Sequence, residues 1–364
     1  MSWRRDLTTF SDGKTIVVVD EGILNTHRQL LGRLRAQDPL LIPVTRRTDP
    51  LRVWSSLREN DQDWNSISAI GGGSAMDVAK ILKLLSDRIL TPQVLESRTR
   101  QPLIVIPTGA EVGRTPLDVI PTNFGTGSHA SDVAIYHKID QQMRVLIVGA
   151  ALRPRSSTSL SEFALSMTHR QIDEGLREML YRFAGPLLMD CPTLPTEVEE
   201  QSISILRKRL AGTLDLRREW STILSVSGSL HRLDLRSTRK SFSHRLWYLA
   251  NELSTLARVS KMTATDYLAR NLWRREIVAG SMGKDVFGNV ASLDALGRRL
   301  TESSNGLQGV LKSLDANSDW QPPADVARRA IRQCRERWAT LVAPGEEWCT
   351  EELHLALKGD LSMP

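Results

Sequence analysis

The residues of this chain best suited to chemistry form a glycine-rich turn, Gly71 to Ser74, followed by Asp77 and Lys80. The apolar run Ile67 to Ile70 precedes the turn, and apolar residues at helical spacing follow from Ala75 to Leu85, so the pattern predicts a strand that leads directly into a helix. Glycine lets the backbone approach a ligand closely, and the first N–H groups of a helix attract anions. We expect a phosphate-binding turn, although an ordinary tight turn would use the same glycines.

A second stretch, Ile120 to Ser131, reads Ile-Pro-Thr-Asn-Phe-Gly-Thr-Gly-Ser-His-Ala-Ser and is rich in small and hydroxyl-bearing residues. It resembles the Pro-Thr-x-x-Gly-Thr-Gly-Ser segment of the iron-containing alcohol dehydrogenase and dehydroquinate synthase superfamily, which lines the nicotinamide side of the cofactor cleft. The turn at Gly71 to Lys80 resembles the pyrophosphate-binding signature of the same superfamily, Gly-Gly-Gly-Ser-x-x-Asp-x-Ala-Lys. The resemblance covers residues 14 to 150 and is weak afterwards.

The resemblance implies a set of cofactor-binding residues: Gly71, Gly72, Gly73, Ser74, Asp77, Lys80, Thr122, Gly125, Thr126 and Ser128. An earlier Pro107-Thr108-Gly109 follows the run Leu103 to Ile106, at the point where the family places its only Pro-Thr. Either one of the two Pro-Thr segments is an insertion or both line the cleft. We assign the nicotinamide side to the later one and retain Thr108 as a candidate phosphate contact.

The end of the first apolar run, Thr15 to Val19, points to the choice of cofactor. Asp20 follows this run, and a carboxylate there can accept hydrogen bonds from the adenosine ribose while repelling a 2′-phosphate. The resemblance assigns the acid at this strand end the same role, so we expect NAD rather than NADP. Asp20 could instead simply cap the following helix, since Asp is a preferred capping residue.

In the C-terminal part, the family pattern is incomplete. Metal-dependent relatives carry an acid on an early helix and then two histidines roughly 14 to 18 residues apart, with a catalytic group about four residues after the first. The resemblance places Glu162 in the position of the acid, His244 in that of the first histidine and Tyr248 in that of the catalytic group. Where the second histidine should stand, the chain has Arg258, Ser260 and Lys261.

Two ligands hold a catalytic cation poorly, because such sites generally need three protein groups. We therefore expect no bound metal, with the Lys261 ammonium stabilising an alkoxide in its place, or with Lys261 acting as a base if burial lowers its pKa. A proton relay through Tyr248 would complete the site. The alternatives remain that His244 and Tyr248 are core residues and that Lys261 is an exposed one. His169 lies seven residues after Glu162, so helix periodicity places these two residues on one face, and His169 could restore a metal site of Glu162, His169 and His244.

The organisation of the chain changes once. Its 364 residues exceed what one core usually fills. Up to residue 150, six short apolar runs alternate with helical segments, which indicates a mostly parallel sheet: Thr15 to Val19, Leu40 to Val44, Ile67 to Ile70, Leu103 to Ile106, Val133 to Tyr136 and Val145 to Val148. Beyond this point the spacing is helical. We expect a Rossmann-like nucleotide-binding α/β domain at 1–150 and an all-helical catalytic domain at 151–364.

The composition limits the possible partners. A net charge of +6 could suit nucleic acid, but the arginines are scattered among acids along helical segments, so we expect no nucleic-acid partner. The sequence shows no membrane-spanning run and no signal peptide, which favours a cytoplasmic protein. We also expect a homo-oligomer.

Together these features predict an NAD-dependent dehydrogenase that oxidises a hydroxyl to a carbonyl. The incomplete metal pattern and basic charge also resemble, more loosely, the dehydrogenases of daptide-type ribosomal peptide pathways, which oxidise a C-terminal threonine before decarboxylation. The substrate would then be a small alcohol or a peptide C-terminus, with Arg153, Arg155 or Arg245 binding the peptide carboxylate. A sugar-phosphate cyclase of the dehydroquinate synthase type and a catalytically silent nucleotide-binding protein are the alternatives.

Overall fold

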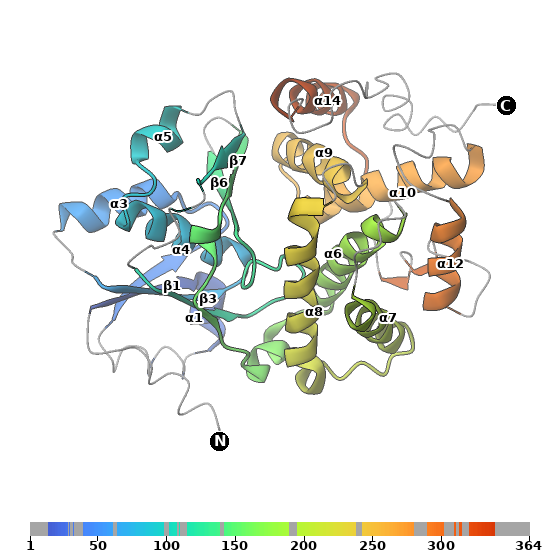
Figure 1. Ribbon diagram of the computed structural model, residues 1–364, viewed down its shortest axis with the longest axis horizontal. Coiled ribbons are helices and arrows are strands. Elements are labelled where there is room, and N and C mark those ends of the chain that lie inside the picture. Colours follow the sequence, from blue (N-terminus) through green and yellow to red (C-terminus); the bar gives the residue numbers. More distant parts are fainter. Residues whose placement is uncertain are drawn as a thin grey trace. The chain divides into compact units, whose positions relative to one another are not determined.

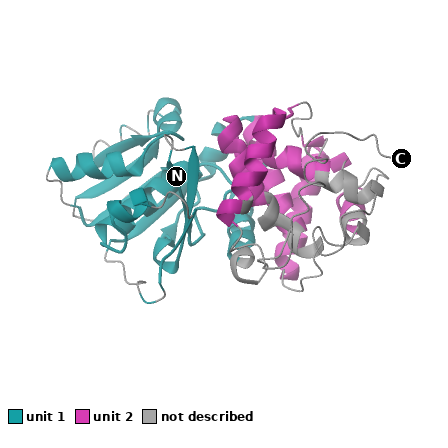
Figure 2. Cartoon of the chain, turned by 90° about the horizontal axis from the view of Figure 1, so that it is seen from above, with its two compact units in different colours: residues 1–168, 215–232 teal, residues 169–214, 233–364 magenta. Residues whose placement is uncertain are grey.

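The structure, a computed structural model, describes residues 14–27, 29, 32, 39–60, 64–97, 102–107, 109, 115–138, 142–188, 195–237, 242–279, 290–301, 309–310, 313–314 and 320–338; the side chains of 185–188, 233–237, 242–246, 272–279, 290–294 and 335 lie outside this description. The chain divides into two compact units (Figure 2). The first comprises Met1–Thr168 and Asp215–Arg232, and the second comprises His169–Leu214 and Leu233–Pro364. The division therefore differs from the boundary expected at residue 150, because residues 151–168 and most of a later helix belong to the first unit.

The first unit is built around a five-stranded sheet whose paired strands are all parallel, in the order β2-β1-β3-β5-β8 (Figure 1). A three-stranded sheet, β4-β7-β6, lies beside it and contains one antiparallel pair, β6 with β7. The strands are β1 Thr15–Asp20, β2 Leu40–Val44, β3 Ser66–Gly71, β4 Leu103–Val105, β5 Leu117–Pro121, β6 Val133–Lys138, β7 Met143–Val148 and β8 Ser156–Ser157. All six predicted runs are strands.

Helix α4, Gly73–Ser86, packs against both sheets of the first unit. Its Met76, Val78 and Leu82 join the core under the five-stranded sheet, whereas Ile81 and Leu84 join the core formed with the three-stranded sheet. Burial on two sides explains the nearly continuous apolar sequence of this helix. The other helices of the unit are α1 Glu21–Thr26, α3 Pro50–Glu59 and α5 Pro92–Ser97, with 3₁₀ turns η2 Ala150–Leu152 and η3 Ser161–Ser166.

The regular elements described in the second unit are all helical, as the sequence predicts. They are α6 His169–Leu188, α7 Thr196–Leu210, α9 Phe242–Ala257, α10 Lys261–Ala279, α12 Val290–Leu300 and α14 Ala324–Trp338. Helix α8, Leu216–Ser237, belongs to the first unit up to Arg232 and to the second from Leu233. None of the described helices is long and apolar enough to cross a membrane. The predicted fold class, an α/β nucleotide-binding part followed by a helical part, is confirmed.

Candidate functional site

Three of the residues selected from the sequence lie at one edge of the five-stranded sheet. Asp20 ends β1, Gly71 ends β3 and Pro121 ends β5. Because these strands are parallel, their carboxyl ends meet at the same edge, where open α/β sheets bind ligands. The Thr122 N–H also donates to the Gly71 carbonyl at 3.1 Å, so the two motifs leave the sheet side by side.

The glycine turn is packed closely against its surroundings. A Cβ at Gly71 would lie 2.7 Å from the Ala75 Cβ and 2.9 Å from the Asp20 Cβ, and one at Gly72 would lie 2.5 Å from Asn123 Nδ2. Gly73 faces Thr126, with 3.3 Å from its added Cβ to the threonine side chain. Glycine is therefore needed here for close backbone packing. Gly72 caps α4 without a side-chain hydrogen bond, so the cap leaves the first N–H groups of the helix available to an anion.

The segment Thr122–Ser131, which we call the cofactor loop, is tied to α4 by two polar side chains. Ser128 Oγ donates to Asp77 Oδ1 at 3.1 Å. Lys80 Nζ donates to the Ser131 carbonyl at 2.9 Å, to Ser131 Oγ at 3.2 Å and to the Val133 carbonyl at 2.8 Å. The two motifs recognised in the sequence thus contact each other directly. Lys80, assigned from the sequence to the cofactor, has its ammonium engaged by this loop.

Helix α8 supports the cofactor loop from another side, which the sequence did not predict. Ser227 Oγ accepts a hydrogen bond from the Gly125 N–H at 3.2 Å. His129 Nε2 lies 2.9 Å from the Leu224 carbonyl, an arrangement in which Nε2 donates. Burial, assisted by the positive charges of Lys80 and Arg232, lowers the pKa of His129 to about 4 against the opposing effect of this hydrogen bond. His129 is therefore neutral at physiological pH.

The remaining cofactor-binding candidates differ in their contacts and in their exposure to solvent. Asp20 Oδ1 accepts from the Gly22 N–H at 2.9 Å and so caps α1, the alternative that the sequence left open. A carboxylate has a second oxygen with which to accept a ribose hydroxyl, so the two roles are compatible. Ser74 is half-buried in the first turn of α4, Thr126 is exposed and Thr122 is buried. Thr108 lies outside the described residues.

The expectation that Glu162 and His169 share one helix face is wrong. Glu162 lies in the 3₁₀ turn η3, which ends at Ser166, and His169 is the first residue of α6. Between them Met167 has extended backbone, with φ −77° and ψ 134°, so the helical register is broken. Helix periodicity therefore cannot bring these two side chains together.

Lys261 begins α10 in the second unit, where its ammonium pairs with a carboxylate of α6. Lys261 Nζ lies 2.8 Å from Glu178 Oε1 and 5.7 Å from the centre of the Trp247 ring. Burial raises the pKa of the Glu178 carboxyl, but Lys261 and Arg182 more than offset this, so its pKa lies below the ordinary value. Lys261 is thus a largely buried, paired cation, and sequence reasoning missed Glu178 because it occupies an unremarkable helical position.

The structure describes the other catalytic candidates only in part. Tyr248 is buried in α9 and stacks on Trp338, with ring centres 4.5 Å apart. His244 also belongs to α9, but its side chain lies outside the described residues. Arg153 and Arg155 pair with Asp132 and Asp118 respectively, and the side chain of Arg245 is not described.

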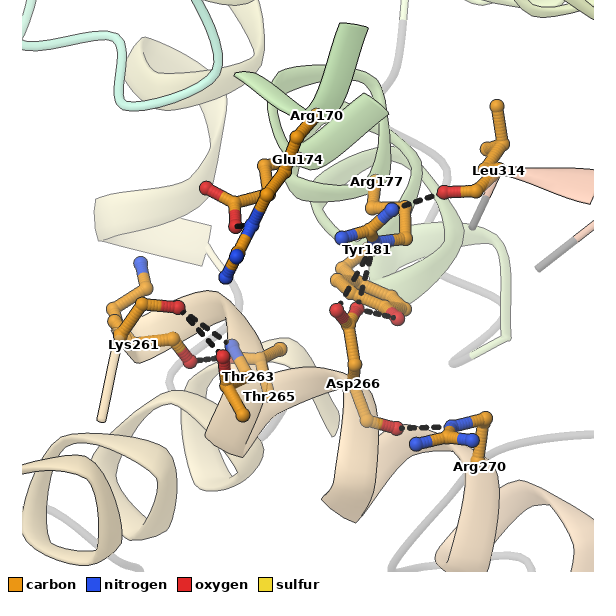
Figure 3. A network of polar contacts seen from close by, with 11 residues as sticks. Arg170, Glu174, Arg177, Tyr181, Lys261, Thr263, Thr265, Asp266, Arg270 and Leu314 are labelled. Atoms are coloured by element: carbon orange, nitrogen blue, oxygen red, sulfur yellow. Dashed lines mark hydrogen bonds and ion pairs between the residues drawn. The ribbon is translucent and has the colours of Figure 1, made fainter. Parts of the chain in front are cut away.

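A buried polar network joins α6 and α10 next to Lys261 (Figure 3). Arg177 Nε lies 3.0 Å from both oxygens of Asp266, and the Tyr181 hydroxyl donates to Asp266 Oδ1 at 2.6 Å. Arg177 also donates to the Leu314 carbonyl. Because each charge in this network is paired, it can hold the start of α10, and with it Lys261, in one position.

The donor groups described do not form a metal centre. Among the described residues, no three side chains of His, Cys, Asp or Glu lie close enough together to hold a metal ion. This result does not include His244, whose side chain is not described. Glu178 is paired with two cations, which leaves its carboxylate little capacity to bind a third.

Both the sequence and the fold of this chain are similar to those of known dehydrogenases. Residues 6–158 match the sequence profile of the iron-containing alcohol dehydrogenase family. The N-terminal part of the chain is therefore similar to this family. No curated protein sequence matches the chain significantly.

Solved structures of two alcohol dehydrogenases and an aldehyde reductase share the fold of this chain over nearly its whole length. An NADH-dependent butanol dehydrogenase from Thermotoga maritima is 12% identical, with a TM-score of 0.68 and coverage of 95% of this chain and 91% of its own. An archaeal alcohol dehydrogenase from a Red Sea brine pool is 14% identical (TM-score 0.70, coverage 98% and 93%). A sulfoacetaldehyde reductase from Bifidobacterium kashiwanohense, solved with NAD+, is 13% identical (TM-score 0.66, coverage 96% and 92%).

Proposed function

We propose that this protein is an NAD-dependent dehydrogenase that interconverts a hydroxyl and a carbonyl by hydride transfer. One observation carries the proposal: the cofactor loop packs onto the glycine turn at the sheet edge where Asp20 also lies. This arrangement fits a dinucleotide, because the uncapped first turn of α4 can bind the pyrophosphate and the Asp20 carboxylate can accept from the ribose. The family match over residues 6–158 and the NAD+ complex of the sulfoacetaldehyde reductase support the same cofactor.

The chain's residues would divide the work as follows. When bound, the nicotinamide supplies the chemistry of hydride transfer. The glycine turn holds the pyrophosphate, and Gly125, Thr126 and Ser128 supply small residues and hydroxyls toward the nicotinamide side. A carboxylate at Asp20 disfavours the 2′-phosphate of NADP. The proton leaving the substrate hydroxyl passes to solvent, with Tyr248 proposed as a relay.

We further propose that Lys261 stabilises the substrate alkoxide without a metal ion. The support is that the chain lacks the family's second histidine and has Lys261 at that place in the sequence. The ion pair of Lys261 with Glu178 supports electrostatic stabilisation by Lys261 rather than its use as a base. Glu162 and His244 would complete the site.

For the substrate, we propose a small-molecule alcohol or the C-terminal threonine of a ribosomally made peptide. In the second case the threonine Cβ gives its hydrogen as a hydride to NAD+ and the hydroxyl loses its proton; the resulting β-keto acid then loses carbon dioxide. The peptide carboxylate would need an arginine, and Arg153 and Arg155 already pair with aspartates, which leaves Arg245 as the candidate. We also propose that the protein is cytoplasmic and that it forms a homo-oligomer.

Absorbance at 340 nm tests the reaction. The purified protein, with its metal content measured, is given NAD+ and a panel of alcohols and of peptides ending in threonine, before and after treatment with a chelator. We expect NADH formation that survives chelation, with release of carbon dioxide only from peptides. Loss of activity on chelation and its return with iron or zinc would refute metal independence. Phosphate release from a heptulosonate phosphate would favour the cyclase, and NADH binding with no turnover of any substrate would favour the silent protein.

A further inference from the structure

Lys80 is a fully buried lysine, with no exposed side-chain surface. It lies in the middle of α4, between the two cores of the first unit. Burial lowers the pKa of its ammonium to about 8, although the carboxylates of Asp77 and Asp132 act in the opposite direction. A cation is costly in such a place unless its donors and its charge are matched.

The acceptors for the Lys80 ammonium lie at and just after the end of the cofactor loop. An ammonium has three N–H donors, and Lys80 directs them to three oxygens: the Ser131 carbonyl, Ser131 Oγ and the Val133 carbonyl. Two of these acceptors are backbone carbonyls, which hold the path of the chain and not merely a side chain. An apolar residue of the same size would leave a buried and a partly buried carbonyl without this donor, a costly change.

The loop is held at several points, and Lys80 supplies the cation among them. Asp77, one turn earlier on α4, accepts from Ser128, and Ser227 of α8 accepts from the Gly125 N–H. The opposite end of the loop contacts the glycine turn through Asn123 and Thr126. A displacement of Ser131 would therefore also displace Asn123 and Thr126, which lie beside the glycine turn.

We propose that Lys80 is a positioning residue, which fixes the cofactor loop against α4 and so preorganises the dinucleotide site without touching the phosphates. This inference rests on the proposed NAD-dependent function. Lys80, which ends the glycine signature, would then act on the nucleotide site through the cofactor loop. All three N–H donors of its ammonium are already directed to oxygens of Ser131 and Val133.

The chain offers a matched control one turn further along α4. Lys83 is also buried, at 6% exposure, but it pairs with Asp87 at 3.1 Å and has no hydrogen bond to the loop. We compare Lys80→Met with Lys83→Met by NADH fluorescence titration and by hydrogen exchange of the Gly125, Ala130 and Ser131 amides, both at a temperature where each variant is folded. We expect Lys80→Met to weaken NADH binding and to accelerate exchange of these amides by about tenfold or more, and Lys83→Met to change neither by more than about twofold.

A double-mutant cycle separates positioning from direct phosphate contact. Ser131→Ala removes one acceptor of Lys80, so it should weaken NADH binding in the parent protein and have little effect in the Lys80→Met background. Additive effects, or equal losses in Lys80→Met and Lys83→Met, would overturn the proposal. If Lys80→Met does not fold, Ser131→Ala decides alone: unchanged exchange and NADH affinity would reject the role.

The hydrogen-exchange measurement needs no nucleotide. If the parent protein fails to bind NADH, the proposed function fails. The positioning of the loop by Lys80 is still tested by whether Lys80→Met, and not Lys83→Met, accelerates exchange of the Gly125, Ala130 and Ser131 amides.

Discussion

The Lys261 ammonium and the Glu178 carboxylate lie 2.8 Å apart, on α10 and α6 of the helical unit. Their side chains are 20% and 8% exposed, so the pair is largely shielded from water. Glu178 also contacts Arg182 at 3.3 Å, one turn along α6. These contacts hold the Lys261 ammonium in one position, which suits a group that stabilises negative charge during a reaction.

Replacing Lys261 by Met should therefore reduce turnover while leaving NADH affinity unchanged. We expect kcat to fall on the order of 10²- to 10³-fold, the usual loss when a stabilising donor of an oxyanion is removed. Arg182→Met is the matched control, because it removes the other cation at Glu178 and should change kcat little. Steady-state kinetics with NADH titration would check both, and an active Lys261→Met would exclude the electrostatic role.

The close approach of Gly72 to Asn123 gives a second prediction. A Cβ at position 72 would lie 2.5 Å from Asn123 Nδ2, so Gly72→Ala should displace the cofactor loop and weaken NADH binding by about tenfold or more. Shortening the opposing side chain in Gly72→Ala/Asn123→Gly should restore much of the affinity. If the double variant binds as poorly as the single one, with the single variant folded by circular dichroism, the methyl group obstructs the nucleotide itself and not the loop.

The glycine turn could be predicted from sequence because local chemistry specifies it. The strand before Gly71 and the helix after Gly73 each follow from local apolar spacing, and both are present. Strand β5, by contrast, was not predicted, because Asp118 interrupts its apolar run between two prolines. In the fold this aspartate is satisfied by Arg155 and Ser156, residues 37 and 38 positions away, and no local pattern reveals such partners.

The helical part shows the same limit. The prediction that Glu162 and His169 share a face assumed a continuous helix, and the chain instead becomes extended at Met167. The partner of Lys261 could not be inferred either, since Glu178 is 83 residues away and no motif marks it. Sequence signatures locate elements well where the ligand imposes a local backbone shape, and less well where side chains from distant helices meet.

Asp20 has a capping role in the structure and a proposed ribose role, and two substitutions separate them. Asp20→Asn keeps a side-chain oxygen that can cap α1 but loses the negative charge, whereas Asp20→Ala loses both. We expect both variants to bind NADPH about tenfold or more better relative to NADH than the parent protein does. Only Asp20→Ala should also lower the free energy of unfolding, by about 1 kcal/mol. If neither variant changes the NADPH to NADH ratio in titration, Asp20 is a cap alone.

The neutral His129, within the cofactor loop, makes the protein sensitive to acid. Its pKa is about 4 in the folded chain against about 6.5 for a histidine exposed to water, so between these pH values the unfolded chain binds more protons than the folded one. The stability that His129 contributes is therefore complete above pH 6.5 and is lost as the pH falls toward 4, a change of roughly 3 kcal/mol.

Urea unfolding at a series of pH values between 4 and 7 would measure this effect. His129→Gln keeps a hydrogen-bond donor for the Leu224 carbonyl and cannot be protonated in this range, so its unfolding free energy should fall less steeply with acid than that of the parent. The matched control is His169→Gln, since His169 is exposed at the start of α6, and it should retain the slope of the parent. NADH affinity should decline over the same pH range in the parent and less so in His129→Gln, because a charged imidazole would displace the loop that packs on the glycine turn. Identical slopes in the parent and His129→Gln would show that the acid sensitivity arises elsewhere.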